Sequence, residues 1–273
     1  MSSRRTKFCR VDAEKCLDEM KAVHGEGQKI VLRQVFYSPS RCSPWHFHGR
    51  LAVLKWAHGN GCLDLTASRE GWLISHFAAH SGHLDVLEWL YAQGILEATA
   101  KDHYLQTPVH VAAYYQHLSV LRWFHSRGLL PSASDQDYEG SNLTLLAAQN
   151  TLPMLQWMHS QGLVDATTKN FAGNSISHLA AEDCYQDMLT WLYDEGLLDV
   201  QDQNNLGETV AHLLTECDYL NALKWLHSVH LLDLNVRNGD GLDIVALAER
   251  SAPKVHAWLL KEVLVSKPDP CEQ

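Results

Sequence analysis

The sequence predicts an all-α solenoid of stacked helix-turn-helix units joined by short finger loops, and three regular spacings predict it. Seven of the nine tryptophans recur every 33 or 34 residues: Trp56, Trp89, Trp123, Trp157, Trp191, Trp225 and Trp258. A leucine stands two residues before the tryptophan in six copies, and a glycine stands five residues after it in five. A period in the low thirties is typical of stacked repeats, in which each unit contacts only its neighbours.

The tryptophan column is interpreted as core packing between neighbouring helices. The alternative is an aromatic ladder for a ligand, but the column shares one helix face with the repeated leucines. A buried aromatic side chain removes about 150–250 Å² from water. Truncating one should therefore cost about 3–5 kcal/mol, a large share of a typical total stability of about 5–15 kcal/mol.

The chain is expected to divide into three parts. Residues 1–37 read as two helices, Val11 to Val23 and Gln28 to Tyr37, that form a cap or a divergent repeat. Residues 38–265 hold about six to seven repeats. The first and last of these are degenerate, and Pro39 and Pro44 shorten the first helix of the Trp56 unit. Residues 266–273 form a polar tail.

Each clear unit follows the same order of elements. It opens at a glycine-type position: Gly71, Leu105, Gly140, Gly173, Gly207 or Gly241. A short helix of small residues, a turn and a longer helix with the tryptophan follow. The glycine after the longer helix fits a left-handed cap position.

These motifs resemble the ankyrin repeat. Thr107-Pro108-Val109-His110-Val111-Ala112-Ala113 is similar to the signature Thr-Pro-Leu-His-x-Ala-Ala, and Gly82-His83-Leu84-Asp85-Val86-Leu87 is similar to its second-helix motif. The resemblance covers about residues 45–265. It implies a binding surface made by the concave face and the finger loops, and signature histidines that bond to neighbouring backbone.

Composition narrows the classes of partner and compartment. The formal net charge is −10, which disfavours nucleic acid or an anionic membrane as the main partner. No apolar run approaches the roughly 20 residues that span a bilayer, and the start of the chain lacks the apolar region of a signal peptide. Seven scattered cysteines without a Cys-x-x-Cys motif favour reduced thiols. We therefore expect a monomeric cytoplasmic or nuclear protein without membrane insertion.

Neither a metal site, a cofactor nor an enzyme is expected. Many of the 17 histidines fall into two columns. The signature histidines are His76, His110, His178 and His212. His58, His125, His159 and His227 stand two residues after a tryptophan, alternating with Tyr91 and Tyr193, where an imidazole suits the helix dipole. Histidines of one column lie on helices about 8–10 Å apart, too far to share a zinc ion. Phosphate-loop, Gly-x-Ser-x-Gly and His-Glu-x-x-His motifs are missing.

Positions that packing does not dictate are the candidate partner-binding residues. On the fingers these are Trp72, His103, Tyr104, Tyr138 and Phe171, and at the ends of the first helices they include His80, Tyr114, Tyr115, Glu182 and Glu216. Clustered exposed aromatic residues are frequent anchors of binding hot spots. Tyr104, Tyr114, Tyr115 and Tyr138 are the predicted anchors. The acidic pair Glu182 and Glu216 suits a partner with a basic and apolar segment. For Trp72 and Phe171 the alternative is packing against the neighbouring finger.

The sequence thus favours a non-enzymatic module or scaffold that binds a partner protein through its concave face and fingers. The first alternative is a regulatory inhibitor that covers the catalytic cleft of an enzyme. A pathogen effector or a ubiquitin-ligase adaptor on the same repeats also remains open, because one fold supports many functions.

Overall fold

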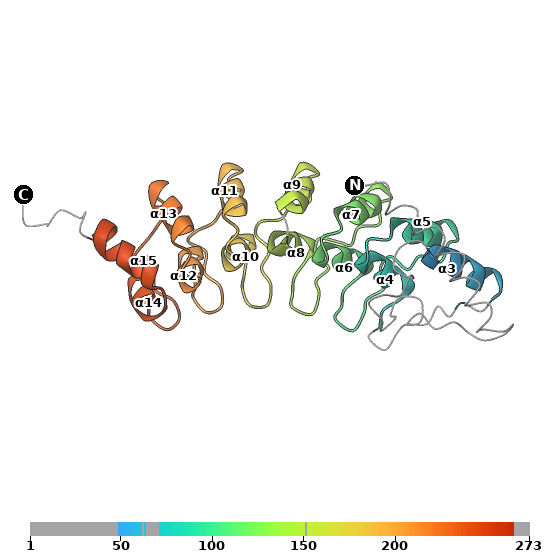
Figure 1. Ribbon diagram of the computed structural model, residues 1–273, viewed down its shortest axis with the longest axis horizontal. Helices are drawn as coiled ribbons and strands as arrows, with labels where there is room; N and C mark the ends of the chain where they lie inside the picture. The colour runs from blue at the N-terminus through green and yellow to red at the C-terminus, as the bar shows by residue number, and fades with distance from the viewer. Residues whose placement is uncertain (1–48, 62, 64–70, 151, 265–273) are drawn as a thin grey trace, which may run out of the picture. The chain divides into compact units, whose positions relative to one another are not determined.

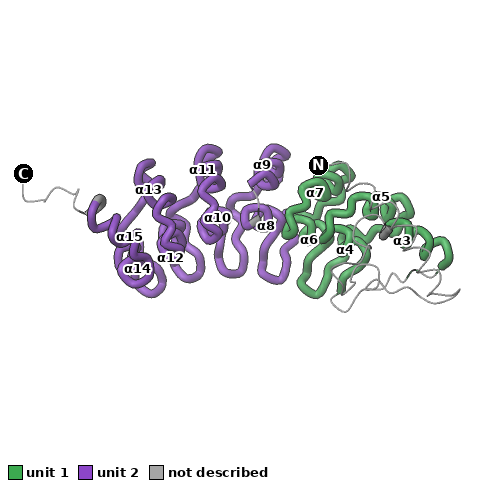
Figure 2. The backbone as a smooth tube through the Cα atoms, in the orientation of Figure 1, with its two compact units in different colours: residues 1–132 green, residues 133–273 purple. Residues whose placement is uncertain are grey.

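The computed structural model describes residues 49–61, 63, 71–150 and 152–264. The predicted helices within residues 1–37 and the tail at 266–273 lie outside these ranges. The chain divides into two compact units, residues 1–132 and residues 133–273 (Figure 2). Helices and loops make up the described residues, in which no β-strand occurs. The predicted all-α class is confirmed.

In unit 1, first helices pack against first helices and second helices pack against second helices. The helices are α3 (Gly49–Gly59), α4 (Ile74–His80), α5 (Leu84–Ala92), α6 (Pro108–Tyr114) and α7 (Leu118–Ser126). The short first helices α4 and α6 pack against each other, and the longer second helices form a second row in which α5 contacts α3 and α7. Each first helix also packs on the second helix of its own repeat.

Unit 2 repeats this arrangement. Its helices are α8 (Leu143–Asn150), α9 (Leu152–Ser160), α10 (Ile176–Glu182), α11 (Gln186–Asp194), α12 (Val210–Glu216), α13 (Leu220–Ser228), α14 (Ile244–Ser251) and α15 (Pro253–Trp258), followed by the π-helical turn η2 (Leu259–Leu264). In Figure 1, α8, α10, α12 and α14 form one row of this unit, α9, α11 and α13 form the other, and the finger loops project from the first row.

In α4, α6, α10 and α12 the signature histidine caps the start of the helix, because its Nδ1 accepts from the backbone N–H of the residue three positions earlier. In α10, the Ser175 hydroxyl donates to Nδ1 of His178 at 2.8 Å, and the backbone N–H of Ser175 approaches the same nitrogen at 3.3 Å. The Thr209–His212 pair in α12 repeats this geometry. Because the first turn of a helix leaves N–H groups unpaired, this exchange fixes where the helix begins.

The same imidazole ties its repeat to the next one. With Nδ1 accepting, Nε2 carries the proton and donates to a backbone carbonyl 30 residues later. His76 donates to Gln106 O at 3.0 Å, His178 to Glu208 O at 3.0 Å and His212 to Leu242 O at 3.2 Å. All three side chains are fully buried, and burial lowers the pKa of each imidazole below its usual value. The backbone bonding implied by the ankyrin resemblance is thus present.

The fingers of unit 2 are linked by backbone hydrogen bonds. The N–H groups of Phe171, Asn205 and Gly239 donate to the carbonyls of Glu139, Ala172 and Leu206, at 2.9, 3.0 and 2.7 Å. Gly173 shows why glycine opens a unit, because a Cβ there would lie 2.5 Å from Oδ1 of Asn205 on the next finger. Its φ of +80° also favours glycine.

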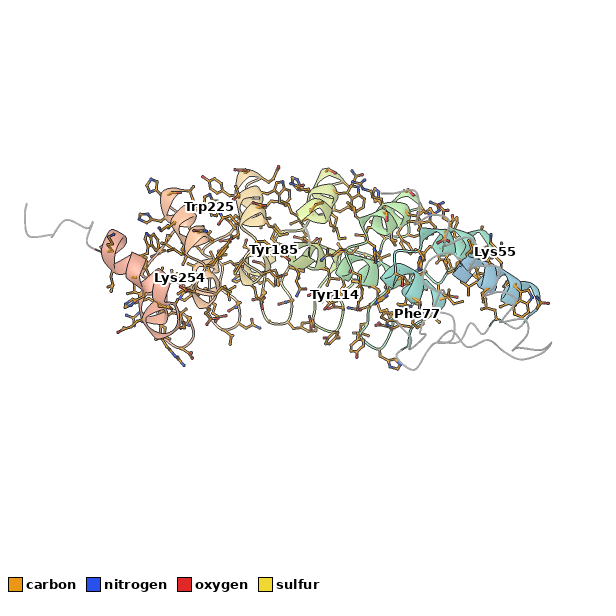
Figure 3. All side chains as sticks on the ribbon, in the orientation of Figure 1. Lys55, Phe77, Tyr114, Tyr185, Trp225 and Lys254 are labelled. Atoms are coloured by element: carbon orange, nitrogen blue, oxygen red, sulfur yellow. The ribbon has the colours of Figure 1, made fainter. Side chains whose placement is uncertain are left out.

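The tryptophans and the residues two positions later form a ladder along the second helices within each unit. In five copies the ring two residues after a tryptophan meets the next tryptophan edge-on, as in Tyr91–Trp123 at 6.0 Å between centroids, His159–Trp191 at 5.5 Å and Tyr193–Trp225 at 5.8 Å. Figure 3 places Trp225 on α13. Trp123 and Trp258 are only 5% and 6% exposed, whereas Trp56, Trp89, Trp157, Trp191 and Trp225 are half-buried. The histidines and tyrosines of this column therefore cover the tryptophans of the following repeat.

Candidate protein-binding surfaces

In unit 1, three rings at the ends of α4 and α6 lie in contact. The His80 and Tyr115 rings meet at 4.1 Å between centroids, and the Tyr114 and Tyr115 rings meet at 5.2 Å, both edge-to-face. We call these three residues the aromatic patch. Both tyrosines are exposed over almost half of their surface, and Figure 3 shows Tyr114 on the first-helix row. Contact between the rings limits their freedom, which lowers the entropy lost when a partner binds.

Trp72 lies under this patch rather than at its surface. Its indole Nε1 donates to Oδ2 of Asp102 on the next finger at 2.8 Å, and its ring packs 5.1 Å from Phe77 and 5.4 Å from His80. Asp102 is buried, and its Oδ1 accepts from the backbone of Tyr104 and Gln106 at 2.8 Å. The contact with the neighbouring finger that was the alternative for Trp72 is therefore present, and the half-buried ring supports His80.

The finger of the second clear repeat presents His103 and Tyr104. Both side chains are exposed. The His103 ring lies over the preceding finger, since a Cβ at Gly71 would be 2.9 Å from its Cδ2 atom. Tyr104 is held at its backbone by Asp102, which leaves its ring at the surface.

In unit 2, the predicted aromatic residues lie on the fingers. Tyr138 is half-exposed, and its hydroxyl donates to Oε1 of Glu139 at 2.7 Å. Phe171 is 67% exposed, yet one edge of its ring covers Gly140, where a Cβ would lie 2.6 Å away. Phe171 thus packs on the neighbouring finger and still offers most of its surface to a partner.

Leu206 is an exposed apolar residue that the sequence did not single out. It is 66% exposed on the finger after that of Phe171. Asn205, beside it, donates its side-chain amide to the Phe171 carbonyl at 2.8 Å. Leu206 stands immediately before Gly207, the position that Tyr104 occupies before Leu105 in unit 1. This shared position was the only sequence signal for an exposed apolar side chain here. Leucine alone is too common at the surface for that signal to decide.

Acidic side chains gather at the ends of α10 and α12 in unit 2. Glu182, Asp183 and Glu216 are exposed at these ends. Partial burial raises the pKa of Glu182 above its usual value, and the charges of Asp183, Glu208 and Glu139 raise it further. Glu216 is raised in the same way by burial and by Glu208. A cation bound beside these carboxylates would reduce the repulsion between them.

The ten predicted residues divide between the two units. Unit 1 contains Trp72, His80, His103, Tyr104, Tyr114 and Tyr115, and unit 2 contains Tyr138, Phe171, Glu182 and Glu216. Within each unit they lie on fingers or at the ends of first helices. Their role in binding stays a prediction.

The described residues contain neither a metal-binding cluster nor a membrane-spanning helix. No group of three or more His, Cys, Asp or Glu side chains in this part of the chain could hold a metal ion. No helix in the same ranges is long and apolar enough to cross a bilayer.

Comparisons with known proteins agree with this architecture. The family model of ankyrin repeats (many copies) matches residues 41–91 and 75–125. No curated protein sequence matches the chain. The matched residues, 41–125, and the fold of the described residues are those of ankyrin repeats.

Solved structures resemble the chain over most of its length. The ankyrin repeat domain of Bcl-3, a member of the IkappaB protein family, aligns with a TM-score of 0.59 and 19% identity over 78% of this chain and 92% of its own. A chain from the complex of the predatory endopeptidase Bd0816 of Bdellovibrio bacteriovorus with the immunity protein Bd3460 aligns with a TM-score of 0.60 and 19% identity, over 72% and 100%. The ankyrin repeat protein EF0377 gives 0.58 and 18%, over 67% and 94%. At these identities the likeness shows the fold alone.

Proposed function

We propose that this chain is a non-enzymatic interaction module that binds a partner protein through its fingers and the ends of its first helices. The aromatic patch of unit 1 carries the proposal. The Tyr115 ring contacts both His80 and Tyr114, and Trp72 packs against His80, so these rings form a preorganised anchor surface. Aromatic side chains of this kind are enriched at binding hot spots.

The acidic surface of unit 2 supports a partner that also carries basic residues. Glu182 and Glu216 are held at raised pKa by partial burial and by neighbouring carboxylates. A lysine or arginine near an apolar anchor would remove this repulsion. Phe171 and Leu206 offer further apolar contacts on the same unit. The proposed compartment is the cytosol, because seven scattered cysteines suit a reducing environment.

Inhibition of an enzyme is the second candidate. One structural neighbour comes from a complex between an endopeptidase and an immunity protein. On this hypothesis the exposed fingers of our chain would cover a catalytic cleft. Adding the purified chain to candidate hydrolases separates the two proposals, because only an inhibitor lowers the rate.

The test of the proposed surface is affinity capture from cell lysate with three versions of the chain, each shown by circular dichroism to be folded. They are the wild type, a variant with Tyr104, Tyr114, Tyr115 and Tyr138 changed to alanine, and a control carrying Tyr193→Ala on the second-helix row. Partners that bind the wild type and the control but not the four-tyrosine variant support the assignment of these tyrosines as anchors. Equal capture by all three contradicts it.

A further inference from the structure

Two cysteines of unit 2 meet across neighbouring repeats. Cys184 lies in the turn after α10, and Cys217 caps the end of α12, which packs against α10. Sγ of Cys217 lies 3.6 Å from the carbonyl oxygen of Glu182, two residues before Cys184. The two thiols are close enough to interact directly. We call Cys184 and Cys217 the cysteine pair, and in Figure 3 the residue after Cys184, Tyr185, marks the turn between α10 and α11.

The geometry of the repeat explains why the two side chains meet. Cys184 has a φ of +57°, the left-handed conformation that Gly82 and Gln116 adopt at the same position of earlier repeats. At Gly82, a Cβ would lie 2.7 Å from Nδ1 of His117 in the next repeat. A side chain at this position therefore points toward the turn of the following repeat. In unit 2, the corresponding turn begins with Cys217.

The two thiols are free and differ in their access to solvent. Neither cysteine is in a disulfide, and Cys217 is exposed whereas Cys184 is only partly so. Partial burial, the neighbouring Cys217 thiol and the carboxylate of Asp183 together raise the pKa of the Cys184 thiol to about 11. The thiolate is the nucleophile in disulfide chemistry, so this shift slows Cys184. We therefore expect Cys217 to react first with a reagent from solvent.

We propose that Cys184 and Cys217 form a reversible disulfide when the chain meets a low-molecular-weight disulfide such as oxidised glutathione. In the first step, the Cys217 thiolate attacks one sulfur of the reagent, which gives a mixed disulfide and releases one glutathione thiolate. The Cys184 thiolate then attacks the Cys217 sulfur, and the second glutathione thiolate leaves. The protons of the two cysteines pass to the two glutathione thiolates, so one disulfide is reduced as the other forms.

The disulfide would join the ends of two first helices that carry the acidic surface. Glu182 ends α10 and Glu216 ends α12, so the link would fix the spacing between these carboxylates. A link of this kind agrees with a reducing compartment, because cytosolic disulfides are usually transient and respond to the redox state. The inference goes beyond the proposed function, since it concerns a covalent change that needs no partner protein.

The test incubates the full chain with oxidised glutathione, blocks the remaining free thiols by alkylation and maps the disulfides by peptide mass spectrometry. The ratio of the Cys184–Cys217 link to mixed disulfides at these cysteines should be at least about tenfold higher in the folded chain than in urea, because the fold holds the thiols together. Dithiothreitol should remove the link. Equal ratios with and without urea, or two separately glutathionylated cysteines in the folded chain, overturn the proposal.

Single substitutions test the order of the two steps, after circular dichroism has shown that each variant is folded. Cys184→Ser should stop at the mixed disulfide on Cys217, because the second thiol is missing. Cys217→Ser should leave most of Cys184 unmodified over the same time, since its thiol stays protonated. The control Cys271→Ser should form the Cys184–Cys217 link as fast as the wild type. If no mixed disulfide accumulates on Cys217 in the Cys184→Ser variant, the proposed route is wrong.

Discussion

The two columns of histidine in this chain have different structural roles. The signature imidazoles at His76, His178 and His212 are neutral, fully buried and bonded at both nitrogens. The imidazoles at His58, His159 and His227 lie against the edge of the following tryptophan. The first set should therefore couple stability to pH, because desolvation lowers the pKa of those groups.

Stability should fall as the pH drops below about 6.5. The unfolded chain binds protons at its histidines there, while the folded chain keeps the buried imidazoles neutral, so protonation favours unfolding. Each such histidine contributes a slope of at most about 1.4 kcal/mol per pH unit. Urea unfolding followed by tryptophan fluorescence from pH 7.5 to 5.5 measures it.

The carboxyl groups with raised pKa act in the opposite direction at lower pH. Glu182, Asp183 and Glu216 take up protons more readily in the folded chain. Their contribution to stability therefore increases as the pH falls from their pKa in the folded chain toward their lower pKa in the unfolded chain. A Glu182→Gln/Glu216→Gln variant keeps the histidine effect and removes most of the opposing one. A stability that does not change between pH 7.5 and 5.5 in this variant contradicts the histidine prediction.

The edge-to-face ladder should give a measurable coupling. Changing Tyr193 and Trp225 to alanine, singly and together, defines a double-mutant cycle with an expected coupling of about 0.5–1.5 kcal/mol. The control cycle pairs Tyr193 with Trp258, which is two repeats further on. Free energies of unfolding from urea titration decide it. Equal coupling in the two cycles would mean that the ring contact contributes nothing specific.

At the level of elements, the position that follows each second helix favours glycine for its backbone conformation but does not require it for space. Gly94, Gly128, Gly162 and Gly196 end second helices with φ between +64° and +69°, and a Cβ at these positions would meet nothing within 4 Å. The repeat can therefore accept a side chain there, and His230 occupies the same position of α13 at φ +60°. The cost of that substitution is confined to the backbone.

His230→Gly should therefore stabilise the chain by about 1 kcal/mol, since an L-residue in the left-handed region costs about 1–2 kcal/mol and glycine loses more entropy on folding. Gly196→Ala, the reverse change at the same position of α11, should destabilise it by a similar amount. Thermal unfolding of both variants beside the wild type measures the two shifts. A lower melting temperature for His230→Gly would show that its imidazole stabilises the fold by contacts that outweigh the backbone strain.

The elements could largely be predicted from the sequence, and the roles of single side chains only in part. The Trp56 to Trp258 spacing predicts the second helices, and Thr107-Pro108 predicts the start of α6, because these features depend on local chemistry. The bond from Trp72 to Asp102 and the cover of Gly140 by Phe171 join different fingers. Spacing within a repeat does not report which atoms meet across repeats.

At the scale of the molecule, the net charge favours a basic partner. With 32 acidic and 22 Lys and Arg residues, the chain carries a formal net charge of −10. Such a field attracts a basic partner over roughly a Debye length, about 10 Å at 0.1 M salt. The exposed carboxylates of α10 and α12 concentrate part of that charge beside the fingers of unit 2.

The association rate with a captured basic partner should fall by about tenfold or more between 0.05 and 0.5 M salt. The Glu182→Gln/Glu216→Gln variant should bind more slowly and show a shallower salt dependence. A control with Glu88→Gln and Asp194→Asn loses the same charge from second helices and should keep the wild-type slope. Surface-based kinetic measurements distinguish these outcomes. If the association rates of both double variants depend on salt in the same way, the effect of Glu182 and Glu216 comes from net charge alone.

The bonds between repeats in unit 2 also bear on how a ribosome delivers this protein. Each finger from Phe171 onward donates its N–H to a carbonyl synthesised about 33 residues earlier. Each signature histidine finds its acceptor 30 residues later. A nascent repeat can therefore dock on a finger that has already emerged, and its own imidazole is satisfied once the next repeat leaves the exit tunnel. Chains released prematurely would leave their last signature histidine without its carbonyl acceptor and open to water, and this exposed repeat end would distinguish unfinished from finished copies.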